Sequence, residues 1–186
     1  TPREKLEVAH QLARLNVDII EAGFPVSSNE DFDAVRRIAL EVEGPRICGL
    51  ARAVNLDIDR AGEALKGAPN TRLHTFIGTS PQHIAMLRKA KGNDDVLKMA
   101  VDAVERARDH CENVEFSPMD AARTERQFLY DVVEATIAAG ATTINIPDTV
   151  GYAIPEEFGQ LIADLLANVP NVDDAVISVH CHDDLG

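Results

Sequence analysis

The chain has 186 residues, which is enough for one domain and marginal for two. It carries 31 Asp and Glu residues against 18 Lys and Arg residues, so its formal net charge is −13. A surface this acidic repels a phosphate backbone, and the uncharged stretch at residues 138–147 is far too short to span a bilayer. We therefore expect neither nucleic acid nor a membrane as a partner.

Short apolar runs alternate with segments of helical periodicity along the whole chain. In chain order, the apolar runs predict strands at residues 17–21, 46–51, 72–77, 114–117, 142–146 and 176–180. The periodic segments predict helices at residues 2–15, 29–42, 56–65, 82–108, 125–139 and 155–166. Ser28 and Ser80 are suited to cap helix starts, and Gly44 and Gly140 lie where helix ends are expected.

Strands that each lead into a helix predict a parallel sheet buried on both faces. An open doubly wound sheet and a TIM (β/α)8 barrel both fit this alternation. Nearly every strand ends in a polar side chain, as is typical of a barrel, and no glycine-rich dinucleotide motif follows any strand. We therefore expect a truncated α/β TIM barrel, with residues 1–186 forming a single domain that is incomplete at both ends.

His180 and His182 carry the clearest chemical signal in the sequence. Alternate residues of a strand point to the same side, so both imidazoles face one spot, with Asp183 and Asp184 beside them. Neutral imidazole is a common metal ligand, so the pair predicts part of a divalent-cation site. A polar strand end without a metal explains the same residues equally well. Three other histidines are interpreted as structural: His10, His83 and His110.

The cysteines are too few and too scattered for a disulfide framework, and their spacing fits no zinc ribbon: Cys48, Cys111 and Cys181. They indicate a reducing compartment, so we expect the protein in the cytoplasm. The chain begins at Thr1 without an initiator Met and stops at Gly186 inside a motif, so we expect a piece of a longer polypeptide.

Five segments resemble the 2-isopropylmalate synthases, a branch of the family that includes homocitrate and citramalate synthases. Two are typical of the wider family: VISVHCHDDLG and TTINIPDTVGY. The others are EAGFPVSSNEDF, RLHTFIGTSPQH and VEFSPMDAARTE, of which GFPVSS and the HTFIGTSPQH segment point to the isopropylmalate branch. The resemblance covers residues 1–186.

The resemblance implies a TIM barrel of which about strands two to seven are present. It implies an acyltransferase of leucine biosynthesis that condenses acetyl-CoA with the 2-oxo acid 3-methyl-2-oxobutanoate to give 2-isopropylmalate and CoA. The implied cofactor is a divalent metal cation, Mn²⁺ or Mg²⁺ with Zn²⁺ as a further option, held by His180 and His182. Two more ligands, the catalytic Arg and a carboxy-terminal regulatory domain are expected outside this chain. The full-length enzyme is expected to be a homodimer.

The same resemblance assigns roles to other polar side chains. His74, Ser117 and Thr149 match the substrate-binding pocket for the keto acid, and Glu21 and His74 are the expected catalytic residues. A structural hydrogen-bond acceptor is an equally good reading of Glu21. At the position of the family's Glu after the fifth strand, this chain has Met119, which neither accepts a proton nor hydrogen-bonds strongly. Either the neighbouring Asp120 takes the role of that Glu, or the chemistry of the pocket differs.

Other readings remain open. A homocitrate or citramalate synthase, or a hydroxymethylglutaryl-CoA lyase, would have the same fold and a different acyl group. A non-catalytic globular fragment and a flavodoxin-like binding domain belong to other classes, although the latter needs an anion-binding loop and GFPVSS has only one glycine. We expect residues 1–186 by themselves to be inactive.

Overall fold

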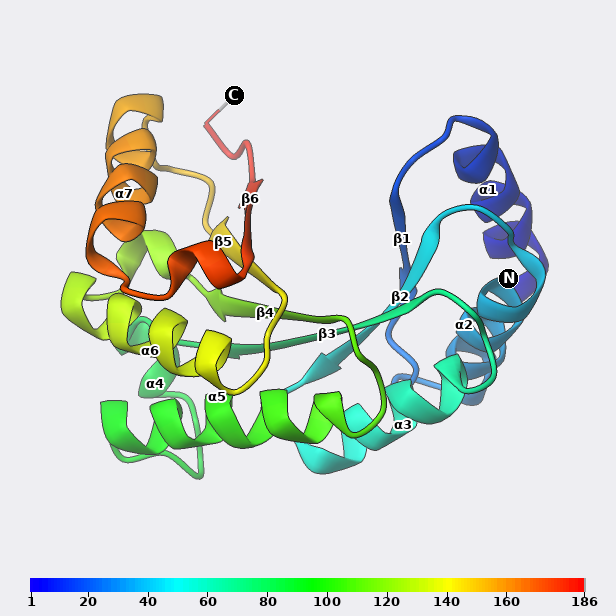
Figure 1. Cartoon of the computed structure of the whole chain (residues 1–186), viewed down its shortest axis with the longest axis horizontal. Coiled ribbons are helices and arrows are strands. Elements are labelled where there is room, and N and C mark those ends of the chain that lie inside the picture. Colours follow the sequence, from blue (N-terminus) through cyan, green and yellow to red (C-terminus); the bar gives the residue numbers. More distant parts are fainter. Residues whose placement is uncertain (186) are drawn as a thin grey trace. The chain divides into compact units, whose positions relative to one another are not determined.

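The structure is a computed structural model that describes residues 1–185; residue 186, where the predicted domain and its last motif end, lies outside the described part (Figure 1). Strands and helices alternate along it. The strands are β1 (Ile19–Gly23), β2 (Arg46–Arg52), β3 (Thr71–Gly78), β4 (Val114–Met119), β5 (Thr143–Asp148) and β6 (Val176–Cys181). The α-helices are α1 (Pro2–Arg14), α2 (Asn29–Glu41), α3 (Asn55–Leu65), α4 (Pro81–Ile84), α5 (Asn93–Arg108), α6 (Arg126–Ala138) and α7 (Pro155–Asn168), and short 3₁₀ helices lie at η1 (Ala121–Arg123) and η2 (Val172–Asp174).

The strand order distinguishes between the two predicted architectures. Hydrogen-bonded neighbours follow the sequence order β1-β2-β3-β4-β5-β6, and the pairs β1–β2, β4–β5 and β5–β6 are parallel. A doubly wound sheet reverses its strand order at a switch point, and this order never reverses. The topology is therefore that of a barrel with six of its strands described, and the flavodoxin-like reading is wrong.

The chain divides into two compact units, and each is described by itself. The first comprises Thr1–Thr75 with Arg106–Val114, and the second comprises Phe76–Glu105 with the chain from Glu115 onward. The first unit holds α1, α2, α3, β1 and β2, and the second holds α6, α7, β5 and β6. The organisation of residues 1–186 as one domain stays a prediction.

In the first unit, α1 and α2 pack together and cover β1 (Figure 1). Thr1 begins α1 through a capping box with Glu4, and Pro2 occupies the first helical turn, where its missing N–H costs nothing. Ser28 caps α2 as predicted, by accepting a hydrogen bond from the backbone N–H of Asp31. The core of this unit consists of apolar side chains: Leu6, Ala9, Ile20, Val35, Ile38, Ala39, Val42, Ile47, Ala64 and Leu65.

In the second unit, β5 is the central strand and pairs with β4 and β6. All six residues of β5 are buried, as the prediction of a sheet covered on both faces requires. None of the six residues of β6 is buried, so that prediction is wrong for this strand. The reason is that β6 has β5 as its one strand neighbour in the described part of the chain.

The predicted helix at residues 82–108 is also wrong, because the chain forms α4 and α5 with a non-helical link between them. The end of α4 tightens into i→i+3 hydrogen bonds from Met86 to His83 and from Leu87 to Ile84. Helix α5 then restarts after Gly92, where the Asp95 carboxylate accepts from a backbone N–H. No helix in residues 1–185 is long and apolar enough to cross a membrane.

Candidate active site

Glu21 and His74, the two expected catalytic residues, form a hydrogen-bonded pair in the first unit. Glu21 lies in β1 and His74 in β3, and 2.6 Å separates Glu21 Oε2 from His74 Nδ1. The Glu21 side chain is 44% exposed, whereas the His74 side chain is 11% exposed. An ionised carboxylate only accepts hydrogen bonds, so with Glu21 ionised the proton lies on Nδ1 and the orientation of the ring is set.

The local backbone explains how β1 presents this carboxylate. Glu21 lies opposite Cys48 of β2, and the register then shifts between Glu21 and Gly23. Gly23 adopts a φ of 147°, which a residue with a Cβ rarely adopts. Such a bulge re-aims the side chains beside it. The Cys48 thiol also lies 3.8 Å from Glu21 Oε2, so the carboxylate is held from two neighbouring strands.

Ser117 lies in the second unit and is paired with Asn145, a residue that the sequence analysis missed. Asn145 Nδ2 donates to Ser117 Oγ over 3.0 Å, and both residues are buried. Ser117 belongs to β4 and Asn145 to the adjacent β5. A lone amide within the apolar run TTINIP was the available signal, because a buried amide requires a polar partner.

Thr149 follows β5 and contacts the turn that follows β4. The backbone N–H of Asp120 donates to Thr149 Oγ1 over 2.9 Å. Asp120 adopts the left-handed conformation, with φ 68° and ψ 37°. Asp and Asn are the non-glycine residues best suited to this conformation. The hydroxyl expected to bind the keto acid is thus held by the backbone of the residue beside Met119.

The Asp120 carboxylate faces inward and is saturated with hydrogen bonds. Its Oδ2 lies 2.5 Å from Ser80 Oγ, 3.0 Å from His83 Nδ1 and 2.6 Å from Arg123 Nη2. Burial raises the pKa of Asp120, but the hydrogen bonds from Arg123, Ser80 and His83 outweigh burial and hold the pKa below its ordinary value. The Asp120 carboxylate is thus occupied by Ser80, His83 and Arg123, which argues against its replacing the acid that the resemblance implies at position 119.

The Ser80, His83 and Asp120 side chains do not form a nucleophilic triad. In such a triad the serine bonds one imidazole nitrogen and the carboxylate bonds the other. Here Ser80 Oγ and Asp120 Oδ2 both lie 3.0 Å from the same atom, His83 Nδ1. Ser80 also caps α4 by accepting from the backbone N–H of His83. This geometry gives no support to a nucleophilic role, and the structural interpretation of His83 stays a prediction.

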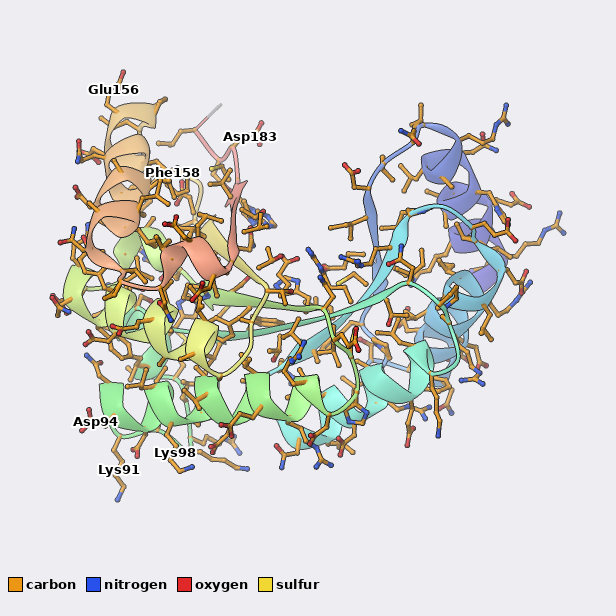
Figure 2. The ribbon with its side chains drawn as sticks, viewed as in Figure 1. Lys91, Asp94, Lys98, Glu156, Phe158 and Asp183 are labelled. Carbon is orange, nitrogen blue, oxygen red and sulfur yellow. The ribbon has the colours of Figure 1, made fainter. Side chains whose placement is uncertain are left out.

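His180 and His182 lie together at the end of β6, as the alternation of side chains predicts. Their ring centroids are 4.9 Å apart and their planes differ by 12°. Both residues are exposed, as is Asp183, which follows them (Figure 2). Two adjacent imidazoles on an exposed strand end fit a divalent cation as part of a ligand set. Within residues 1–185 no group of three or more His, Cys, Asp or Glu residues is placed to hold a metal ion.

The loop after β5 fixes the position of this histidine pair. The backbone N–H of His182 donates to the carbonyl of Asp148 over 3.3 Å. Gly151 lies against the same segment with φ +63°, and a Cβ on it would meet Asp184 Oδ2 at 2.6 Å and His182 Cβ at 2.8 Å. The Asp148 side chain accepts from the backbone N–H of Ala153, which holds this loop in turn.

The expected site residues thus fall into four local groups. The Glu21–His74 pair belongs to the first unit. Ser117, Thr149 and the histidine pair belong to the second unit, where each has its own structural partner. The structure places Glu21 beside His74 and His180 beside His182, while the roles of all these residues stay predictions.

The fold defined by this strand order occurs in solved structures. The chain superimposes over its whole length on hydroxymethylglutaryl-CoA lyase from Pseudomonas aeruginosa, with a TM-score of 0.76, 18% identity and 63% of that chain covered. The HMG-CoA lyase from Brucella melitensis gives a TM-score of 0.75 with 18% identity over 66% of that chain. These likenesses confirm the predicted truncated TIM barrel.

The sequence matches the HMGL-like family over residues 1–186, and the chain belongs to that family. Among curated relatives, it is 62% identical over 186 residues to a 2-isopropylmalate synthase of Syntrophus aciditrophicus. It is 59% identical to the 2-isopropylmalate synthase of Aquifex aeolicus, again over its full length. The resemblance to the 2-isopropylmalate synthases is thereby confirmed, and the chain spans 36% of the length of each of these two relatives.

Proposed function

We propose that this chain is the barrel region of a 2-isopropylmalate synthase. The observation that carries the proposal is the exposed, stacked His180 and His182 pair in a chain 62% identical throughout to a protein of that name. In the proposed reaction the methyl group of acetyl-CoA loses a proton, and the resulting carbanion attacks the keto carbon of 3-methyl-2-oxobutanoate. Water then cleaves the thioester, which releases 2-isopropylmalate and the free thiol of CoA.

His180 and His182 provide two ligands for a divalent cation, Mn²⁺ or Mg²⁺, with Zn²⁺ as the further option. When bound, such a cation polarises the keto carbonyl and stabilises negative charge on its oxygen. The remaining ligands come from elsewhere in the polypeptide, since residues 1–185 hold no third protein ligand placed beside this pair.

Ser117 and Thr149 bind the keto acid through their hydroxyl groups, and His74 binds it through its imidazole ring. Thr149 Oγ1 already accepts from Asp120, so its O–H is oriented as a donor. A donor of this kind suits the carboxylate or carbonyl oxygen of the substrate. Glu21 acts through His74. It accepts a hydrogen bond from His74 Nδ1 and thereby fixes the orientation of the imidazole ring toward the keto acid.

The partners proposed on this basis are acetyl-CoA and a 2-oxo acid, in a cytoplasmic homodimer of the full-length enzyme. The same barrel is also suited to related acyl acceptors, and Met119 in place of the family's acid makes the choice of acceptor an experimental question. The 2-isopropylmalate reaction is favoured because the curated relatives cited above bear that name.

The test measures free thiol released from acetyl-CoA by the full-length protein with added Mn²⁺ or Mg²⁺. We expect turnover with 3-methyl-2-oxobutanoate to exceed turnover with 2-oxoglutarate, pyruvate or no keto acid. Preference for 2-oxoglutarate or pyruvate would instead indicate a homocitrate or citramalate synthase. Cleavage of hydroxymethylglutaryl-CoA without condensation would indicate a lyase, and no reaction with any of these substrates would support a non-catalytic role.

A further inference from the structure

The turn after β4 is built around a single buried carboxylate that joins two further loops. Asp120 is fully buried, and its side chain binds Ser80 and His83 from the segment after β3 and Arg123 from η1. Its backbone N–H binds Thr149, which follows β5. One residue therefore connects the loops that follow three successive strands.

The backbone on both sides of Asp120 is also fixed by hydrogen bonds. The carbonyl of Asp120 accepts from Thr124 Oγ1 over 3.0 Å, and the Met119 carbonyl accepts from the Thr79 N–H over 3.0 Å. The Thr79 and Thr124 hydroxyls lie 2.7 Å apart and are buried. Because the carbonyls before and after it are both held, the left-handed conformation of Asp120 and the direction of its N–H are closely determined.

This direction decides what the Thr149 hydroxyl can do. A hydroxyl has one donor and two acceptor positions, and Asp120 occupies one acceptor position of Thr149 Oγ1. No residue of the described part of the chain accepts from the Thr149 O–H. The hydroxyl is therefore held with its hydrogen available to an anionic or carbonyl oxygen of a ligand.

We propose that Asp120 is a positioning residue whose buried carboxylate sets the Thr149 hydroxyl as a hydrogen-bond donor to the keto acid. The proposal rests on the proposed function in one respect, namely that Thr149 contacts the keto acid. Asp120 acts entirely through Thr149 and does not reach the reacting atoms, because its carboxylate is saturated by Arg123, Ser80 and His83.

Two substitutions at this position separate the carboxylate from the backbone conformation. Asp120→Asn removes the charge and keeps a residue that accepts the left-handed conformation. Asp120→Ala removes the side-chain bonds and also disfavours that conformation. In the full-length enzyme we expect Asp120→Asn to lower kcat/KM for the keto acid about tenfold and Asp120→Ala to lower it further. The KM for acetyl-CoA is expected to stay within about twofold of its original value.

A double-mutant cycle with Thr149→Val tests whether the effect passes through the hydroxyl. If it does, Asp120→Asn in the Thr149→Val background costs less than about twofold in kcat/KM for the keto acid. Independent, multiplied effects would overturn the proposal. Asp131→Asn is the matched control, because Asp131 is an exposed carboxylate on α6 that accepts from Gln127 and has no bond to this turn.

Hydrogen exchange of the Asp120 amide tests the structural link without any substrate. Thr149→Val removes the acceptor, so this amide is expected to exchange at least about tenfold faster, whereas Thr149→Ser keeps the wild-type rate. Unchanged exchange in Thr149→Val would overturn the link between the two residues. Faster exchange combined with unaltered keto-acid kinetics in Thr149→Val would instead overturn the substrate role of Thr149, and with it the positioning role of Asp120.

Discussion

Gly151 offers a direct test of how the loop after β5 supports the histidine pair. It adopts φ +63°, a left-handed conformation in which a residue with a Cβ is strained by about 1–2 kcal/mol. In Gly151→Ala the new methyl group would also lie 2.8 Å from His182 Cβ and 2.9 Å from the backbone N of Asp184. The flexible end of Asp184 can rotate away, but these two atoms require the chain itself to move.

Residues 182–185 are exposed, so we expect that segment to swing outward rather than remain compressed. The loss of stability is then limited to about 1–2 kcal/mol of backbone strain. This strain lowers the melting temperature for thermal unfolding of the barrel by about 2–8 °C. Displacement of His182 from its place beside His180 should in addition weaken Mn²⁺ binding, because the two imidazoles no longer converge.

Gly159→Ala provides a matched control within the same unit. Gly159 lies inside α7, where an added Cβ would meet nothing within 4 Å, so alanine there is expected to stabilise the helix by about 0.5–1 kcal/mol. Calorimetry of the full-length protein should therefore show shifts of opposite sign for the two variants. Metal titration should show a loss of affinity in Gly151→Ala alone. An unchanged melting temperature and metal affinity in Gly151→Ala would refute the reasoning.

Four further outcomes are expected. Substitution of His180 or His182 by Ala should abolish metal-dependent condensation with little change in circular dichroism, and near-normal activity at limiting metal would contradict the ligand assignment. Thr149→Val should lower kcat/KM for the keto acid about 10- to 150-fold in steady-state kinetics. A change in the KM for acetyl-CoA alone would contradict this prediction. Hydrogen bonds from Arg106 and His110 lower the pKa of Asp59 from 3.8 to about 2. These bonds therefore stabilise the folded protein above pH 3.8, and this stabilisation is lost as the pH falls to about 2. Asp59→Asn should accordingly lower the melting temperature at pH 7 but not at pH 2, and an equal effect at both pH values would be inconsistent with this pKa. Residues 1–186 expressed alone should release no thiol from acetyl-CoA with 3-methyl-2-oxobutanoate, and a sizing experiment should show self-association. Thiol release by a protein that the sizing experiment shows to be a monomer would mean that no essential ligand lies elsewhere.

The architecture was predictable because it depends on patterns that are local in the sequence. The strand predicted at residues 142–146 corresponds to β5 at Thr143–Asp148, since a run this short and rich in β-branched residues favours a buried strand over a helix. The helix at residues 82–108 failed for the complementary reason. Its apolar spacing continues past the true end of α4, and periodicity alone does not show the non-helical link that precedes α5, where Asp95 accepts from the backbone N–H of Lys91.

The site was predictable only as far as residue type and strand position specify it. Alternation along β6 placed His180 and His182 on one side without knowledge of any other element. The partner of His74 is 53 residues away in the sequence, and the partner of Ser117 is 28 residues away. Such pairings depend on strand register, which no local pattern specifies, and the Asn145 contact was missed for that reason.

Met119 and Asp120 show why a substitution in a site is not compensated by a neighbour in the sequence. Residues two apart in a strand face the same side, so Met119 shares the side of Ser117 at the end of β4. Asp120 lies one residue further on, where the left-handed turn directs its carboxylate inward to Arg123. Moving that carboxylate toward the side of Met119 would require breaking its buried hydrogen bonds and leaving the Arg123 guanidinium without its partner. These bonds therefore argue against Asp120 as a substitute for the acid that the resemblance implies at position 119.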